Sequence, residues 1–267
     1  MTTPRPRRLI TSRFLAPAVV PEISCIVDAK TPLGFDLRTF VTAAQRFIDE
    51  HLGPVWGVAA RLRIRRRTRP GCWALLFVDT EPQASDDGWH DLTADGFPLA
   101  KVFLRVLEND LTAADRLHPK AFQDEVTLTV THEIAEMLVD PAITLCVQRI
   151  GFGVYSLEVA DPVEEDGFTI DGFKMTDFVY PSWYEQFHKP GSTRFDHCGK
   201  CQRPFHILKD GYASIFRRGR WNDHCGSRKK RAWFEREDRR GHRSEQRKHT
   251  GHLVRSTRLT TPKQARS

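Results

Sequence analysis

The spacing of apolar residues along the chain predicts a mixture of strands and helices. Runs that are mostly apolar, or that alternate between apolar and polar residues, are typical of strands. The most apolar of these runs, Cys72 to Val78, predicts a central strand. Other strands are expected at 23–27, 55–64, 99–106 and 154–159.

Two segments carry apolar residues at helical spacing. The first begins at Asp36, whose side chain can cap a helix N-terminus, and is expected to end near Leu52, before Gly53-Pro54. The second is expected from Asp124 to Val139. Its buried face would consist of Val126, Val130, Ile134, Met137 and Leu138, and its other face of Thr129, His132, Glu133, Glu136 and Asp140.

The remaining patterns predict hairpins. Together with the strands and helices above, they predict a fold of the α+β class. Asp171-Gly172 between two apolar runs is a strong hairpin signal. A second hairpin is expected at 204–221, with turns near Asp210-Gly211 and Gly219. We divide the chain into a basic arm rich in Pro and Arg, a main domain, a hairpin region that contains cysteines, and a basic tail, at residues 1–21, 22–190, 191–225 and 226–267.

The positive charge of the chain is concentrated in the basic tail. The net charge is +7, and residues 226–267 hold 14 Lys/Arg against 4 Asp/Glu, so the rest of the chain is slightly acidic. Basic residues interleaved with Trp233 and Phe234 can bind phosphates and stack on bases, which predicts non-specific binding of nucleic acid. A solvated tail, or one that docks on an acidic protein, is the alternative.

The apolar content favours a folded protein without a membrane partner. Hydrophobic residues make up 40% of the chain and include 17 Phe, which is enough for a substantial core. No apolar run approaches the roughly 18–20 residues of a membrane helix. The basic N-terminal stretch lacks the unbroken apolar segment of a secretory signal. We therefore expect a cytoplasmic protein, or a virion component if it is encoded by a phage.

The segment that carries chemistry is His132-Glu133-Ile134-Ala135-Glu136 on the second predicted helix. Residues 132 and 136 lie four apart, so His132 and Glu136 point from one face and can hold one metal ion together. Glu133 can then take a proton from the water that the metal activates, as in the His-Glu-x-x-His motif. Glu136 stands where that motif has its second His, and zinc accepts a carboxylate oxygen there. The alternative is a solvated polar helix face.

A third metal ligand is expected from the acidic segment that follows the strand at 154–159. Glu158 is the first candidate, and Asp161 and Glu164 are the next choices for a ligand or for a supporting role. Acids clustered around an Asp-Pro turn call for a cation to neutralise them. His90, in the polar segment before the strand at 99–106, is expected to orient substrate or to assist electrostatically.

The cysteines raise the question of a second zinc ion. Six cysteines in 267 residues are too few for a disulfide scaffold. Cys198 and Cys201 have the two-residue gap of a zinc knuckle, and Cys225 with one His could complete four ligands. Such a site would be structural. The alternative is a hairpin region with ordinary thiols.

Several segments together resemble a known family. They read VTLTVTHEIAEMLVDP at 126–141, EVADPVE at 158–164 and TDFVYPSWY at 176–184, with PVWGV at 54–58 and GWH at 88–90. Over about residues 25–190 the chain resembles largely uncharacterised zincin-like metallopeptidases of bacteria, fungi and bacteriophages. The resemblance implies a mixed sheet packed on the helix that bears His132, metal-binding roles for His132 and Glu136, and a base role for Glu133. It leaves the third ligand and the substrate open.

These observations lead to two functional hypotheses. The first is a metal-dependent hydrolase, a zinc peptidase acting on peptide or protein substrates, with His132, Glu136 and one of Glu158 or Asp161 on the metal and Glu133 as general base. The second is a zincin-like assembly protein without catalysis, such as a bacteriophage particle component. Its basic tail would bind protein subunits or nucleic acid.

Overall fold

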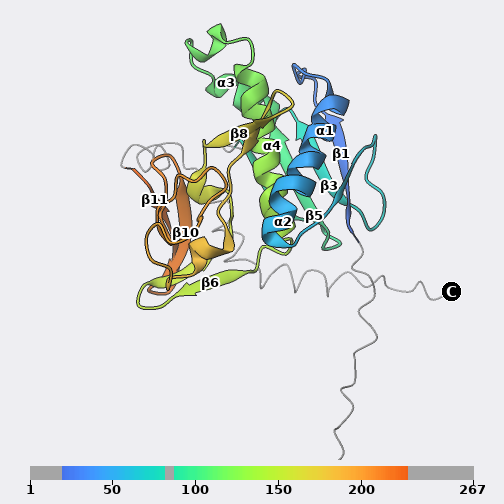
Figure 1. The fold of residues 1–267 in the computed structure, drawn as a ribbon. Coiled ribbons are helices and arrows are strands. Elements are labelled where there is room, and N and C mark those ends of the chain that lie inside the picture. The colour runs from blue at the N-terminus through green and yellow to red at the C-terminus, as the bar shows by residue number, and fades with distance from the viewer. Residues whose placement is uncertain (1–19, 82–86, 228–267) are drawn as a thin grey trace, which may run out of the picture.

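A computed structural model describes residues 20–81 and 87–227 and has a mixed α+β architecture (Figure 1). The α+β class expected from the sequence is therefore confirmed. Almost all of the predicted arm at 1–21, and all but two residues of the predicted tail at 226–267, lie outside the described residues.

The largest sheet has five strands in the order β2-β1-β3-β5-β4. Strands β1, β2, β3 and β5 run parallel, and β4 pairs antiparallel with β5 at one edge. The central position of β3 confirms the prediction from its apolar run. The bounds are β1 Glu22–Asp28, β2 Arg61–Ile64, β3 Trp73–Val78, β4 Gly88–Leu92 and β5 Pro98–Phe103.

Two smaller antiparallel sheets follow along the chain. One has the order β11-β10-β7-β6, and the other is the β8-β9 hairpin. Asp171 and Gly172 join β8 to β9 with φ of 49° and 83°, the left-handed pair that a tight hairpin turn requires, which confirms the Asp-Gly prediction. The bounds are β6 Cys146–Arg149, β7 Gly153–Ser156, β8 Gly167–Ile170, β9 Phe173–Thr176, β10 Tyr212–Arg217 and β11 Arg220–Cys225.

The helices lie mostly in the first half of the chain. Asp36 caps the first one, because its side chain accepts a hydrogen bond from the Thr39 N–H, as the sequence predicts. The bounds are α1 Leu37–Arg46, the π-helix η1 Phe47–Leu52, α2 Gly53–Trp56, α3 Leu104–Asp110, α4 Ala121–Val139 and the 3-10 turns η2 Asp115–Leu117, η3 Asp161–Val163 and η4 Pro181–Tyr184.

The expected helix stop at Gly53-Pro54 is wrong. The helical segment continues from α1 through η1 into α2. It ends at Gly57, which takes a left-handed φ of 69°. The wider π-helical turns lie immediately upstream of Pro54, where an ordinary α-helix would bring the proline ring against a carbonyl. The strand expected from residue 55 therefore shortens to β2.

Three other expected boundaries also move. The strand expected at 99–106 ends at Phe103, because Leu104 begins α3. His90, expected in a polar segment, lies on strand β4. The hairpin expected at 204–221 is β10-β11, which turns at Gly219 as predicted but starts only after Asp210-Gly211 and runs to Cys225.

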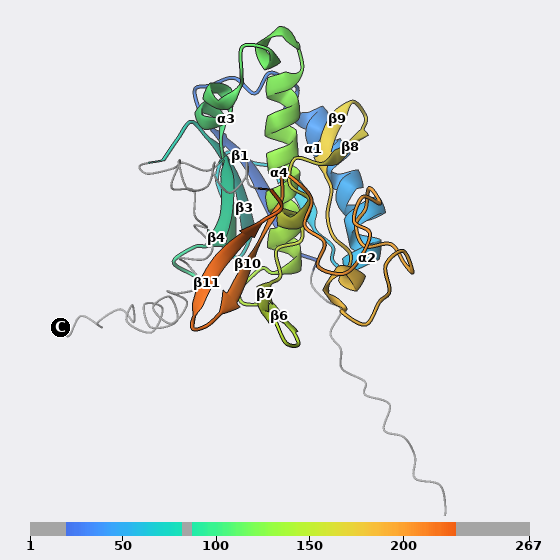
Figure 2. The same ribbon diagram turned by 90° about the vertical axis from the view of Figure 1, so that its left-hand side faces the viewer.

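Helix α4 runs through the middle of the molecule, as Figure 2 shows. It contacts β4 and β5 of the five-stranded sheet and also β9 of the hairpin. Since both sides are covered, most of its residues are buried, including Glu133 and Glu136, which are 3% and 0% exposed. The alternative of a solvated polar face is therefore wrong for these two residues.

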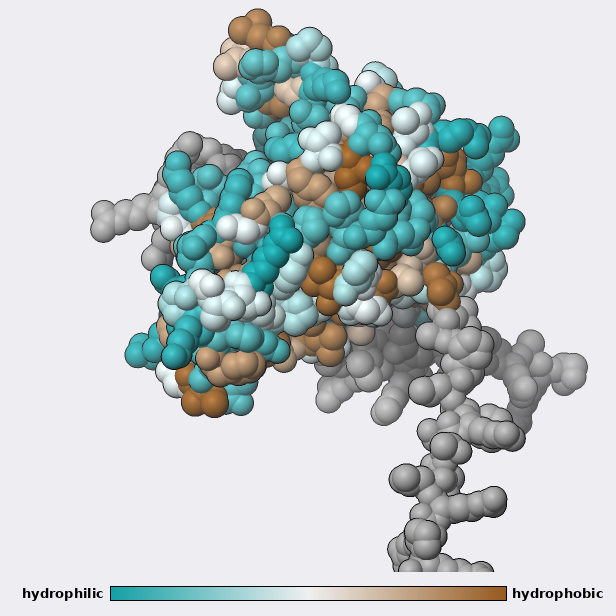
Figure 3. Space-filling view, viewed as in Figure 1, coloured by the Kyte–Doolittle hydropathy of each residue, from teal (hydrophilic) through white to brown (hydrophobic). Residues whose placement is uncertain are grey.

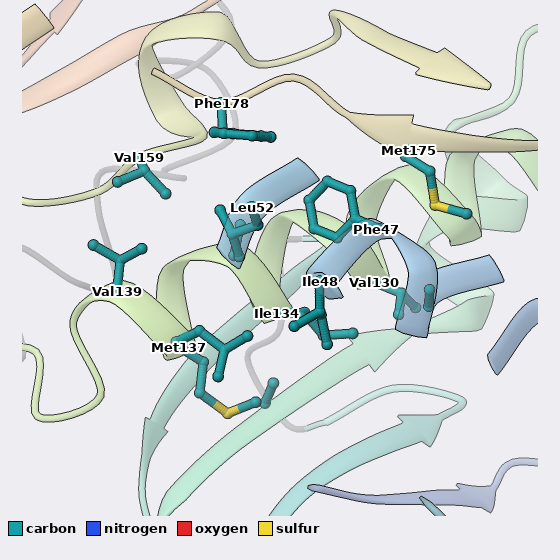
Figure 4. Packing of buried hydrophobic residues seen from close by; sticks show 14 of the residues in the cluster. Phe47, Ile48, Leu52, Val130, Ile134, Met137, Val139, Val159, Met175 and Phe178 are labelled. Carbon is teal, nitrogen blue, oxygen red and sulfur yellow. The ribbon is translucent and has the colours of Figure 1, made fainter. Parts of the chain in front are cut away.

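The core lies between α4 and the elements around it. Val159, which follows β7, and Met175 and Phe178, in and just after β9, close the same cluster. Figure 4 shows how the side chains of η1 meet those of α4: Phe47, Ile48 and Leu52 face Val130, Ile134 and Met137. This packing fixes the rotation of α4, and with it the direction of its polar side chains.

The face drawn in Figure 3 is mostly hydrophilic, with smaller apolar areas between the polar ones. Among residues 20–81 and 87–227, the structure contains no helix that is both long and apolar enough to cross a bilayer.

Candidate metal centre

The C-terminal half of α4 supplies three polar side chains to the interior. His132 and Glu136 lie one helical turn apart, and the His132 Nε2 atom is 3.3 Å from Glu136 Oε2. The Glu136 side chain is fully buried, whereas that of His132 is 13% exposed. The expected pairing of these residues on one face of a helix is confirmed, and His132 gives the pair access to solvent.

The segment after β7 brings the downstream acids to the helix. The backbone N–H groups of Ala160 and Asp161 donate to Glu136 Oε1 over 3.1 and 3.3 Å. The Tyr184 hydroxyl donates to the Glu158 carbonyl over 2.9 Å. These contacts hold the segment against α4, so both expected candidates for the third ligand reach the site.

Asp161 stands closest to the expected metal pair. Its Oδ1 atom is 3.2 Å from His132 Nε2, and His132, Glu136 and Asp161 form a group whose ligand atoms lie within 4.8 Å of one another. A tetrahedral zinc site with bonds of about 2.0–2.1 Å places neighbouring ligand atoms about 3.3–3.4 Å apart. The two measured separations therefore match the spacing that such a site requires.

His90 enters the same interior from β4. Its Nδ1 atom is 3.3 Å from Glu133 Oε2 and 3.8 Å from Glu136 Oε2, and the ring is 1% exposed. Gly88, two residues earlier, lies so close to α4 that a Cβ atom there would be 2.9 Å from Thr129 Cγ2 and 3.3 Å from Glu133 Cγ. Because Gly88 has no side chain, β4 packs directly on α4, and this packing places His90 next to Glu133.

Glu158 belongs to a second group that His90 completes. His90, Glu136 and Glu158 each offer a ligand atom within 4.8 Å of the other two, and all three residues are buried. Glu136 is common to both groups. The sequence assigned no ligand role to His90, because the short strand that carries it was not recognised.

The carboxylates give the site a negative potential. Burial, followed by the charges of Asp161 and Glu164, raises the pKa of Tyr212 well above its usual range. A buried region of this sign favours a cation.

The cysteines named from the sequence lie in two different places. Cys198 and Cys201 belong to a loop in which their backbone N–H groups donate to Asp177 and Asp196. Cys225 is the last residue of β11 and pairs with Tyr212. Within the described ranges, the groups of side chains that could hold a metal contain none of these cysteines.

Comparison of the chain with protein-family models, with curated proteins and with solved structures gave no match. The chemistry of the site therefore has to be judged from its own side chains. Of the residues expected to bind metal, His132, Glu136, Glu158 and Asp161 all meet at α4, with Glu133 beside them.

Proposed function

We propose that the protein is a metal-dependent hydrolase of zincin-like fold that holds zinc on His132, Glu136 and Asp161. Support comes from the mixed sheet packed against α4, from the His-Glu-x-x-Glu motif on that helix, and from the resemblance of residues 25–190 to zincin-like metallopeptidases. We assign the third ligand to Asp161 rather than to Glu158, because Asp161 Oδ1 is 3.2 Å from His132 Nε2.

The spacing of the donor atoms is the observation that carries the proposal. One imidazole nitrogen and carboxylate oxygens at 3.2 and 3.3 Å from it form a donor set that zinc accepts. Three protein ligands also leave a fourth position open, as catalytic zinc sites do. A zinc ion there would supply Lewis acidity, which polarises a carbonyl group and lowers the pKa of water.

Glu133 is the residue that would move the proton. It neighbours His132 on the buried helix, and its carboxylate would take a proton from the attacking water and pass it to the leaving amine. The His90 ring lies beside that carboxylate, with its Nδ1 atom 3.3 Å from Glu133 Oε2. The buried helix packing keeps bulk water away from both groups.

We favour a peptide as the substrate. Strand β4 is at the edge of the sheet and carries His90 next to the site. An extended peptide is the kind of ligand that pairs with the backbone of an edge strand. The alternative function, a non-catalytic assembly protein, depends on the basic tail and stays a prediction, since nearly all of that tail is outside the described residues.

The first experiment is the metal content of the purified protein by elemental mass spectrometry. We expect zinc in the wild type, one ion fewer per chain in His132→Ala, and an unchanged zinc content in Glu133→Gln. His118→Asn is the control, because His118 is exposed and is not part of either metal-binding group. A zinc content that does not fall in His132→Ala, or a wild-type protein that takes up no zinc, would overturn the assigned site.

The second experiment measures turnover on a library of fluorogenic peptides. We expect cleavage by the zinc-loaded wild type and a loss of about 10²–10⁴-fold in Glu133→Gln, the contribution usual for a general base. Full activity in Glu133→Gln would refute the role of Glu133. Zinc bound at the site without cleavage of any peptide would refute the choice of substrate.

A further inference from the structure

Two ligand groups meet at one carboxylate in the interior of the protein. His132 and Asp161 form one group with Glu136, and His90 and Glu158 form a second group with the same residue. The proposed function uses only the first group. The second contains the same kinds of donor, an imidazole and two carboxylates, and its members are all buried.

The geometry of Glu136 explains how one residue can serve both groups. Its Oε1 atom accepts two backbone N–H groups, from Ala160 and Asp161. Its Oε2 atom faces both imidazoles, at 3.3 Å from His132 Nε2 and 3.8 Å from His90 Nδ1. The backbone clamp on Oε1 thus fixes Oε2 between the two rings.

The carboxylates of the second group are as deeply buried as those of the first. Glu133, Glu136, Glu158 and Asp161 are all less than 4% exposed. Buried carboxylates are found with hydrogen-bond donors or with cations, so a cation between His90, Glu136 and Glu158 fits their burial.

We propose that His90, Glu136 and Glu158 form a second divalent-cation site, so that the centre is dinuclear with Glu136 Oε2 shared between the two ions. This inference rests on the proposed function, because it shares Glu136 with the zinc site. Nitrogen and oxygen donors without sulfur suit Mn²⁺ as well as Zn²⁺. A second ion would add a second Lewis acid, as in hydrolases whose two metals are about 3.5–4 Å apart.

The proposal gives Glu158 and His90 definite tasks. Glu158 becomes a ligand rather than a spare candidate, and the Tyr184 hydroxyl holds its backbone in place. His90 becomes a ligand whose Nδ1 atom also lies 3.3 Å from Glu133 Oε2. The base and the second ion would therefore occupy neighbouring positions.

The test uses Mn²⁺ as the probe, because Mn²⁺ prefers oxygen and imidazole donors and so avoids the cysteines. Metal-free full-length protein is titrated with Mn²⁺, bound ions are counted after gel filtration, and the electron paramagnetic resonance spectrum is recorded. We expect about two ions per chain and a spectrum broadened by coupling between neighbouring ions. An isolated ion would give a simple six-line spectrum.

The variants identify which ligands hold which ion. We expect His90→Asn and Glu158→Gln each to bind about one ion with a six-line spectrum, and His118→Asn to behave as the wild type. Circular dichroism checks that each variant is folded. If only one of the two variants folds, its ion count and spectrum test the second site. If neither folds, the ion count and spectrum of the wild type test whether the centre holds two ions.

The outcomes separate this proposal from the proposed function. One uncoupled ion in the wild type, retained in His90→Asn and Glu158→Gln, would overturn the second site and leave the first intact. Two coupled ions that persist in both variants would overturn the assignment of His90 and Glu158. A fourth variant, His132→Asn, should keep about one ion at His90, Glu136 and Glu158, and loss of all metal binding in this variant would overturn the second site.

Discussion

Replacing Asp177 by asparagine should stabilise the protein at alkaline pH and leave its stability near pH 4 unchanged. Asp177 and Asp196 are both fully buried. Asp196 accepts the backbone N–H groups of Lys200 and Cys201, and Asp177 accepts those of Phe178 and Cys198. Two carboxylates in one buried site cannot both be ionised cheaply.

The size of the effect follows from the pKa of Asp177. Burial, and then the neighbouring Asp196, raise this pKa from 3.8 to about 7. The folded protein therefore binds a proton that the unfolded chain has lost, so stability falls as pH rises from about 4 to about 7. The difference between 3.8 and about 7 corresponds to a loss of about 4 kcal/mol in the free energy of unfolding over that pH range. This loss is a large fraction of the stability of a typical domain.

The assay is urea unfolding of wild type and Asp177→Asn at several values between pH 5 and pH 8, with excess chelator throughout. The amide of Asn imitates the protonated carboxyl, so the free energy of unfolding of the variant should exceed that of the wild type by about 1–2 kcal/mol at pH 5 and by about 4 kcal/mol at pH 8. Asp95→Asn, at an exposed position, is the control. A difference between wild type and Asp177→Asn that does not change with pH would refute the reasoning.

Three further predictions concern the site and its supports. Gly88→Ala should lower the free energy of unfolding by about 1–3 kcal/mol and weaken zinc binding, because the new Cβ lies 2.9 Å from Thr129 Cγ2. Unchanged urea unfolding and unchanged zinc affinity would contradict this prediction. Asp140→Ala should cost about 1–3 kcal/mol in urea unfolding, because Asp140 accepts the N–H groups of Thr144 and Leu145 after α4, and Asp140→Asn should cost less. Chelation should lower the melting temperature of wild type more than that of His132→Ala, since zinc bound at one site at 100 times its Kd adds about 2.7 kcal/mol to the free energy of unfolding. Equal shifts in both proteins would speak against the zinc site on His132.

Local signals in the sequence predicted local structure well. The cap at Asp36 and the turn at Asp171-Gly172 each depend on a few neighbouring residues, and both predictions are confirmed. The prediction that the first helix ends before Gly53-Pro54 is wrong, because the π-helix upstream accommodates the proline. Such π-helical turns are rare and have no clear sequence signal. The order of the strands in the sheet follows from long-range packing, which the pattern of apolar residues does not specify.

The site shows the same division between near and distant residues. The spacing of His132 and Glu136 on one helix determines that they meet, so the pair could be predicted. Asp161 was one of two candidates, and only the backbone clamp on Glu136 brings it next to His132. His90 was missed as a ligand candidate, because its approach depends on β4 lying at the sheet edge against α4.

The order of the ligand-bearing segments along the chain has a consequence for protein synthesis. Strand β4 and helix α4 leave the ribosome before the segment that carries Asp161, which follows Glu136 by 25 residues. At about 5–20 residues per second, these residues take about 1–5 s to be made. During that interval the nascent helix presents Glu133 and Glu136 without the backbone that later covers them. The proposed zinc site is therefore completed late in biosynthesis, and a chain cut short before Asp161 would lack it.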